Sequence, residues 1–174
     1  MTARPGVVFY DLEWSDQELI QIGAVSEDES FERTILNDRD IQPHVTAKIL
    51  LQTRRGEGGL RQIYECQSKQ FLQCCSTEAA LQDFLSFLQE IYFRHGQLFL
   101  VSHGSEDIPI LYNSFSEYDM DQHFLARVSN FVNFQDYLKT YFPGLPPSLA
   151  ALVKRCCPDA SYRLHTALDD ARSV

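Results

Sequence analysis

Two carboxylates stand one residue apart at the end of an apolar segment near the amino terminus. The segment Val7–Tyr10 is rich in β-branched and aromatic residues, and Asp11 and Glu13 follow it. This pattern predicts a buried strand that runs to about Glu13. Alternate residues of a strand point to the same face, so both carboxylates project together. Like charges so placed repel unless a cation lies between them, which makes a divalent metal ion a fitting ligand. The alternative is a polar strand end that faces solvent.

A third candidate carboxylate follows a second apolar segment, Leu98–Val101. The chain leaves this predicted strand through the polar stretch 102–107 and enters a helix with Asp107 at its start. An acid at a helix start is often only a cap or a partner of the helix dipole. Asp107 therefore has two interpretations, a metal ligand or a helix cap, and Glu106 is the substitute ligand.

A histidine and an aspartate near the carboxyl end complete the set of reactive residues. His165 and Asp170 are five residues apart, which on one continuous helix would turn them about 140° from each other. They converge only if His165 lies in a loop before the helix and Asp170 lies on its inward face. A histidine in a loop beside a metal-bound carboxylate is suited to be a general base. The alternative is an incidental histidine at a helix start with a solvated acid nearby.

These residues need a scaffold that brings the two ends of the chain together. Strands come first in the sequence, and helices then alternate with strands. This order is typical of an α/β domain with a mixed sheet, antiparallel at one edge and parallel in the middle. No repeat, linker or low-complexity tract is found, so we expect one domain over residues 1–174. The predicted strands are Val7–Glu13, Leu19–Val25, Phe31–Leu36, Leu98–Val101 and Phe131–Phe134.

Helices are predicted from apolar periodicity and from capping residues. The clearest opens at Ser76 and ends before Gly96. Four basic residues gather in one segment: Lys48, Arg54, Arg55 and Arg61. A solvated loop is the favoured interpretation of this segment, and a loop that contacts substrate is the alternative. The predicted helices cover residues 46–55, 76–95, 108–115, 136–142, 148–156 and 164–172.

The composition, 44% apolar and 22% charged residues, is that of an ordinary globular protein. With 24 acids against 15 bases the net charge is −9, which argues against a broad basic face that coats long nucleic acids. An enzyme that holds one end of a nucleic acid through metal ions is still compatible with this net charge.

No apolar run is long enough to span a membrane, and residues 1–6 do not resemble a signal peptide. Five cysteines, including two vicinal pairs, are expected to be reduced. We expect a cytoplasmic or nuclear protein that is not secreted.

The motifs together resemble those of the DEDDh exonucleases. This ribonuclease-H-like family includes proofreading subunits, ribonuclease T, oligoribonuclease and the three-prime repair exonucleases. Phe9–Glu13 with Glu18–Val25 is similar to the family's first motif, Leu100–Leu111 to its second, and His165–Ala171 to its third, H-x-A-L-x-D-A. Within the family, the sequence is most similar to the exonuclease-like domain of the promyelocytic leukaemia protein, with Maelstrom and Exuperantia as more distant relatives.

This resemblance implies a ribonuclease-H-like mixed five-stranded sheet flanked by helices. It also implies hydrolysis of phosphodiesters at the 3′ end of single-stranded DNA or RNA, with release of nucleoside 5′-monophosphates. His165 would be the general base. Oxygen ligands of this kind suit two divalent cations, Mg²⁺ or Mn²⁺. The resemblance assigns four carboxylates to these ions: Asp11, Glu13, Asp107 and Asp170.

Three further residues are expected to contact the substrate. The resemblance implies that Leu12 packs on the last base, that His103 of the second motif lies beside the substrate, and that Trp14 either does so or belongs to the core. No protein partner is indicated.

The sequence also departs from the family's pattern. Trp14 and Ser15 replace the usual Thr-Gly, and His103-Gly104 replaces His-Asn, with a short gap to Asp107. The chain ends four residues after Asp170, so we expect a domain trimmed at its carboxyl end. Several relatives have lost catalytic carboxylates. The alternative function is therefore a catalytically weak or inactive module that binds nucleic acid or protein.

Overall fold

Six strands form one mixed sheet in the order β7-β3-β2-β1-β8-β9. The computed structural model describes residues 4–146, 148–156 and 167–173. The first three strands form an antiparallel meander, and β8 and β9 continue it in parallel on the other side of β1. This confirms the predicted α/β class and mixed sheet, and adds β7 as a two-residue edge strand. The strands are β1 (Gly6–Ser15), β2 (Glu18–Val25), β3 (Ser30–Ile35), β7 (Cys74–Cys75), β8 (Leu98–Ser102) and β9 (Asn130–Asn133).

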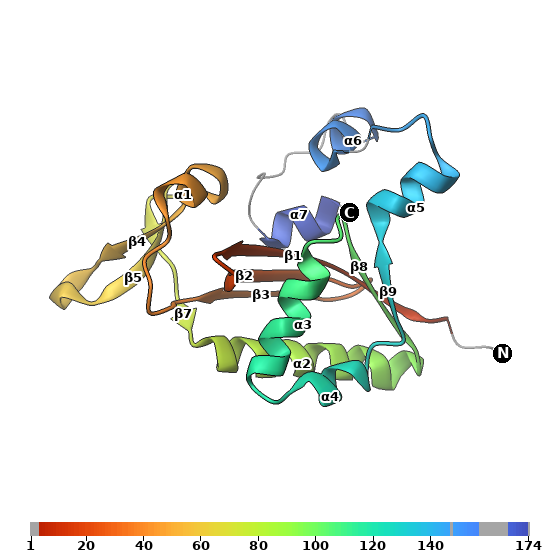
Figure 1. The fold of residues 1–174 in the computed structure, drawn as a ribbon, viewed down its shortest axis with the longest axis horizontal. Helices are drawn as coiled ribbons and strands as arrows, with labels where there is room; N and C mark the ends of the chain where they lie inside the picture. The colour runs from red at the N-terminus through yellow and green to blue at the C-terminus, as the bar shows by residue number, and fades with distance from the viewer. Residues whose placement is uncertain (1–3, 147, 157–166, 174) are drawn as a thin grey trace.

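Helices cover both faces of this sheet (Figure 1). On one face lie α2 (Thr77–His95) and α3 (Asp107–Glu117), and on the other lies α7 (Ala167–Ser173). The Ser76 side chain accepts a hydrogen bond from the Ala79 N–H at the start of α2, and Gly96 ends the helix in the left-handed conformation. Both ends therefore agree with the prediction from sequence.

The hydrophobic core lies between the sheet and the α2 side. Val8, Tyr10 and Leu12 alternate along β1 toward this side and pack with Phe84 and other buried residues of α2. Further core residues come from α3 and from α4 (Asp121–Leu125), a short helix that packs on α3. Burial of these apolar surfaces stabilises the fold, at about 25 cal/mol for each Å² removed from water.

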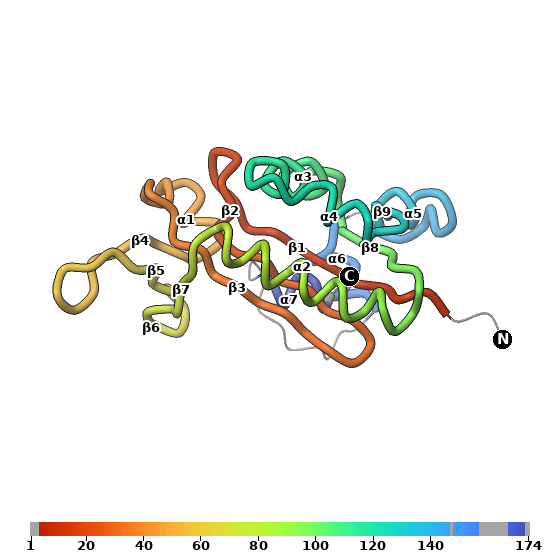
Figure 2. Tube along the Cα trace, turned by 90° about the horizontal axis from the view of Figure 1, so that it is seen from below, coloured from red at the N-terminus to blue at the C-terminus, as the bar shows by residue number. Residues whose placement is uncertain are grey.

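A small arm, defined here as Pro43–Phe71, projects from the body at the β7 edge (Figure 2). It contains α1 (Pro43–Ile49) and a three-stranded antiparallel sheet of β4 (Leu51–Arg55), β5 (Arg61–Glu65) and β6 (Gln70–Phe71), with a 3₁₀ turn, η1 (Glu57–Gly59), between β4 and β5. Its apolar residues form a second, smaller cluster with Ile20 of the body.

The helix predicted over residues 46–55 is wrong. Leu50 adopts a left-handed backbone conformation, with φ of 57°, and ends α1 after Ile49. The following residues then extend into β4, which pairs with β5. No local pattern of residues marks this pairing, because strand pairing depends on contacts between separate segments of the chain.

The remaining described helices are α5 (Phe134–Tyr141) and α6 (Leu149–Cys156). α5 begins two residues earlier than predicted, because the Asn133 side chain accepts hydrogen bonds from the N–H groups of Gln135 and Asp136 and caps the helix. In the described part of the chain, none of the helices has the length and apolar character needed to cross a membrane.

Candidate metal centre

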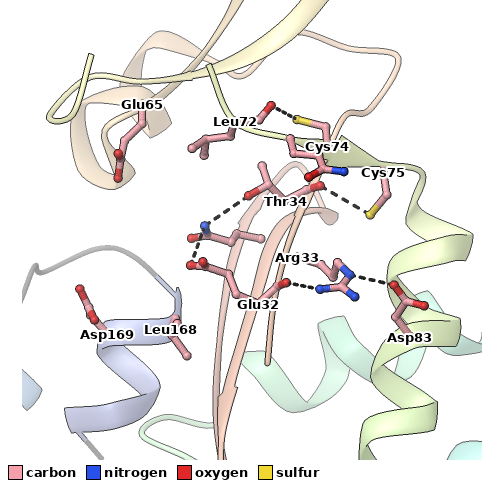
Figure 3. Close-up of a pocket in the computed structure, with 12 residues that line it drawn as sticks. Glu32, Arg33, Thr34, Glu65, Leu72, Cys74, Cys75, Asp83, Leu168 and Asp169 are labelled. Carbon is pink, nitrogen blue, oxygen red and sulfur yellow. Dashed lines mark hydrogen bonds and ion pairs between the residues drawn. The ribbon is translucent and has the colours of Figure 1, made fainter. Parts of the chain in front are cut away.

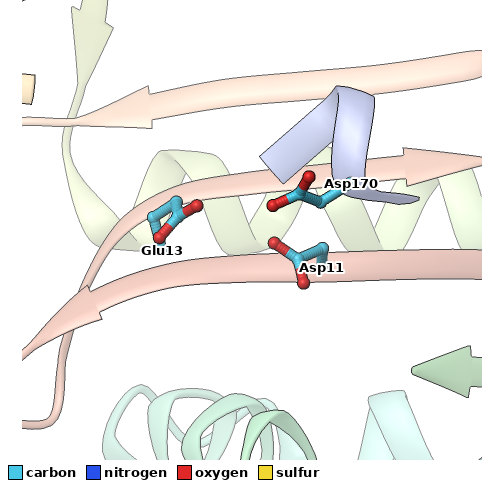
Figure 4. A group of neighbouring side chains, drawn as sticks. All are labelled: Asp11, Glu13 and Asp170. Carbon is cyan, nitrogen blue, oxygen red and sulfur yellow. The ribbon is translucent and has the colours of Figure 1, made fainter. Parts of the chain in front are cut away.

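Three carboxylates from the two ends of the chain meet on the α7 face of the sheet (Figure 4). Asp11 and Glu13 alternate along β1 on the face opposite Leu12, and Asp170 approaches from α7. One ligand oxygen from each of the three lies within 4.8 Å of the others. Glu13 and Asp170 are only 9% and 8% exposed, so little water separates these charges from one another.

The position of α7 depends on small side chains. Ala167, Asp170 and Ala171 share one side of the helix, since they are three and four residues apart, and both alanines are buried. Beneath them lies Gly23, which pairs with Asp11 across the two strands. A Cβ atom at position 23 would overlap the backbone of Ala167 and Leu168. The third sequence motif and this glycine therefore work together to bring Asp170 to β1.

Gln21 also holds the start of α7. Its Oε1 accepts a hydrogen bond of 3.0 Å from the Ala167 N–H, and its Nε2 donates to the Thr34 hydroxyl oxygen at 3.4 Å. The side chain is 3% exposed and stands opposite Glu13. We did not single out Gln21 or Gly23 from the sequence. Their signal was a polar residue and a glycine inside an otherwise apolar predicted strand.

Asp107 is the first residue of α3, directly after the loop that follows β8. It lies outside the group of three, yet its charge raises the pKa of both Asp11 and Glu13. Burial raises the pKa of Asp107 itself to about 6, opposed by a hydrogen bond with the Trp14 side chain. Glu106, the substitute ligand, is exposed. Asp107 is thus the acid of the second motif that interacts with the β1 carboxylates.

The electrostatics of the cluster indicate a place for a cation. Burial raises the pKa of Asp11 well above its ordinary value, and Asp107, Glu13 and Asp170 raise it further. Burial followed by repulsion from Asp170 and Asp107 raises the pKa of Glu13 to about 8. Within the described residues, the neighbours that shift these two pKa values are carboxylates. A set of converging, buried carboxylate oxygens fits a hard divalent cation.

The residues predicted to contact the substrate lie in different surroundings. Leu12 is 4% exposed and belongs to the core on the α2 side, so its expected packing on a base is corrected: strand alternation turns it away from the carboxylates. Trp14 packs against the core, and its side chain lowers the pKa of Asp107. His103 lies half-buried in the loop before α3, where its carbonyl accepts a hydrogen bond from the Gln135 N–H. His165 lies outside the described residues.

A groove of about 730 Å³ borders the centre on the same face of the sheet (Figure 3). Leu168 and Asp169 of α7 form one side of it, Glu32 of β3 its floor, and Glu65 and Leu72 its far side. Burial raises the pKa of Glu32, and the charges of Asp169 and Glu65 add to this effect. Arg172 opposes this shift, and Arg33, which is paired with Asp83 at 2.7 Å, also lines the groove.

Comparisons with known proteins agree with this architecture. A family model described as the Exuperantia RNase H-like domain matches residues 15–142; the match begins after Asp11 and Glu13 and ends before Asp170. No curated protein matches the sequence. The crystal structure of a full-length 3′-exonuclease is similar to this chain, with a TM-score of 0.65 and 13% sequence identity. The alignment covers 98% of this chain and 78% of the exonuclease chain. At that identity the likeness concerns the fold alone, and it confirms the predicted ribonuclease-H-like fold.

Proposed function

This chain belongs to the family of Exuperantia RNase H-like domains, and on that premise we propose that it is a metal-dependent 3′–5′ exonuclease. Its substrates would be single strands of DNA or RNA, and its products nucleoside 5′-monophosphates. The observation that carries the proposal is the convergence of Asp11, Glu13 and Asp170 within 4.8 Å, with Asp107 in electrostatic contact.

In this proposal Asp11, Glu13 and Asp170 hold one divalent cation, and Asp107 helps Asp11 to hold a second. When bound, such ions stabilise the charge on the attacking and leaving oxygens of a phosphodiester. Mg²⁺ or Mn²⁺ suits carboxylate ligands. Gln21 and Gly23 hold α7 close to β2 and so determine the position of Asp170.

His165 is proposed as the general base that accepts the proton of the attacking water. A base contributes on the order of 10²–10⁴-fold to a rate. His165→Ala should therefore reduce turnover by at least about a hundredfold while the rise in melting temperature on addition of Mn²⁺ stays near that of the wild type. Retention of most activity would exclude the general-base role, and loss of the Mn²⁺ effect would make His165 a ligand.

The direct test uses a single strand that carries a fluorophore on its 3′-terminal nucleotide. We expect release of the labelled mononucleotide in Mn²⁺, none in excess EDTA, and none from a strand blocked by a 3′-phosphate. Asp170→Asn should abolish release, whereas Asp169→Asn, which changes the adjacent residue and its ion pair with Arg172, should retain it. Activity in excess EDTA, or cleavage of a circular strand, would contradict the proposal.

A second candidate function is a nucleic-acid-binding module without hydrolysis. The family match favours it, because residues 15–142 include none of the three clustered carboxylates. Wild-type protein that binds the labelled strand but releases no mononucleotide in Mn²⁺ would decide for this candidate.

A further inference from the structure

The arm differs from the body in charge. Residues 43–71 contain five basic side chains and two acidic ones, whereas the whole chain has 15 basic and 24 acidic residues. The arm is thus a positive projection on a strongly negative protein. Its charged residues are Lys48, Arg54, Arg55, Arg61 and Lys69 against Glu57 and Glu65.

Two arginines of the arm have no carboxylate partner in the described part of the chain. Arg54 donates to the side-chain oxygen of Gln52 at 2.8 Å, and Arg55 donates to the Gly59 carbonyl at 3.0 Å. Both are exposed. Elsewhere arginines commonly pair with acids; these are Arg33, Arg39, Arg61, Arg94 and Arg172.

The register of the arm adds an unfavourable contact. Arg55 and Arg61 stand directly opposite each other on β4 and β5. Like charges in that position destabilise a sheet, and only Arg61 is compensated, by Asp40 at 2.8 Å. An anion bound at the end of the arm would remove this repulsion.

Aromatic rings lie beside the positive charge on one face of the arm. Tyr64 is opposite both Gln52 and Phe71, so the three side chains share a face, and Arg54, two residues after Gln52, joins them. The Arg54 guanidinium lies 3.9 Å from the centre of the Tyr64 ring, and the Phe71 ring is 5.3 Å from that of Tyr64. Phe71 is 44% exposed. Glu65, the neighbour of Tyr64, points to the other face and lines the groove (Figure 3).

From this arrangement we propose that the arm is a second binding surface for a single nucleic-acid strand. Arg54 contacts its phosphates on the face shared with Tyr64 and Phe71, and Phe71 stacks on a base. Arg55, whose side chain alternates to the other face, contacts a phosphate where the strand passes the end of the arm. Positive charge next to exposed aromatic rings is how proteins hold single strands without sequence preference. The inference rests on the proposed function only in its choice of ligand.

The test measures binding rather than hydrolysis. Fluorescence anisotropy of a 5′-labelled single strand is followed in EDTA at several salt concentrations, with the double variant Arg54→Gln/Arg55→Gln. The matched control, Arg33→Gln/Arg94→Gln, removes the same charge from the body. We expect the arm variant to bind about tenfold more weakly and to lower the salt dependence by about 1.4, at about 0.7 for each phosphate contact. The control should bind within about twofold of the wild type. Equal losses in both variants would overturn the proposal.

A second pair of variants separates base stacking from charge. Phe71→Ala should weaken binding of the strand about fivefold or more and leave binding of an abasic strand of equal length unchanged. Leu60→Ala, which removes another exposed apolar side chain of the arm, should change neither. If poly-glutamate competes as well as the strand at equal charge, the arm is a surface for acidic protein and the proposal fails. Wild-type protein that binds through the arm but does not hydrolyse would overturn the proposed function and leave this inference standing.

Discussion

The two faces of the large sheet have opposite effects on stability, although alternate residues of the same strand form them. Toward α2, β1 presents Val8, Tyr10 and Leu12, all almost completely buried. Toward α7 it presents Asp11 and Glu13, whose pKa values are raised by burial and mutual repulsion. The first face stabilises the fold, and the second destabilises it in the absence of a cation. A site of this kind is possible because the apolar face supplies the stability that the acidic face lacks.

The largest expected effect comes from Asp11→Asn on the acidic face. Turnover should fall by at least about a thousandfold, since bound metal supplies several kcal/mol to the transition state. The metal-free protein should melt at a higher temperature than the wild type, because a repelling charge is removed. Nucleotide release and thermal melting measure the two effects.

Asp16→Asn is the matched control for this variant. Asp16 lies in the exposed turn after β1 with a φ of 51°, a conformation that asparagine tolerates. It should alter neither turnover nor melting. A metal-free Asp11→Asn protein that is less stable than the wild type would contradict the contrast between the faces.

The opposite result is expected on the apolar face. Phe84 is fully buried and its ring lies 5.2 Å from that of Phe31. Phe84→Ala should lower the free energy of unfolding by about 3–5 kcal/mol, measured by urea denaturation, with turnover per folded molecule unchanged. Phe93→Ala, at a position on the same helix that is 67% exposed, should change stability by less than about 0.5 kcal/mol. A loss of turnover in folded Phe84→Ala would show that the faces are coupled.

Gly23→Ala tests the contact that joins α7 to the acidic face. The added methyl group overlaps the backbone at Ala167, so we expect a loss of about 1–3 kcal/mol in the free energy of unfolding together with loss of stabilisation by Mn²⁺. Calorimetry with and without Mn²⁺ measures both. Gly144→Ala, where a methyl group meets no atom within 4 Å, is the control. If Gly23→Ala retains the full Mn²⁺ effect, the height of α7 does not determine the site.

The smallest effect within any one pH unit is the dependence of stability on pH. The folded pKa of Glu13, about 8, lies above its ordinary value of 4.5, and that of Asp11 is raised as well. The folded state therefore holds protons that the unfolded state has released. As pH rises toward 8, the metal-free protein should lose about 1 kcal/mol of stability for each pH unit, and the loss should level off above 8. Urea denaturation in EDTA measures it. Saturating Mg²⁺ should suppress this loss, and a metal-free stability that rises with pH would contradict the prediction.

Much of the scaffold was predictable because its signals are local. The apolar run before Asp11, the cap at Ser76 and the left-handed Gly96 each mark the start or end of an element within a few residues. The same holds for the carboxylates of the site, since strand alternation places Asp11 and Glu13 on one face whatever the rest of the chain does. The arm was not predictable in this way. β4 pairs with β5, which begins only after a 3₁₀ turn, and a leucine in a left-handed conformation ends α1.

What the sequence by itself determined is the set of reactive groups and the alternation that separates them from the core. Only the tertiary structure decided which of them meet. Asp170 reaches Asp11 because Gly23 lacks a side chain and because Gln21 binds the first described N–H of α7. Leu12 does not face the carboxylates, because it packs in the core on the face that α2 covers. Arg54 gains a shared face with Tyr64 and Phe71 only through the pairing of the arm's strands. Such contacts join residues far apart in the chain, and their energies depend on distances that no local pattern of residues contains.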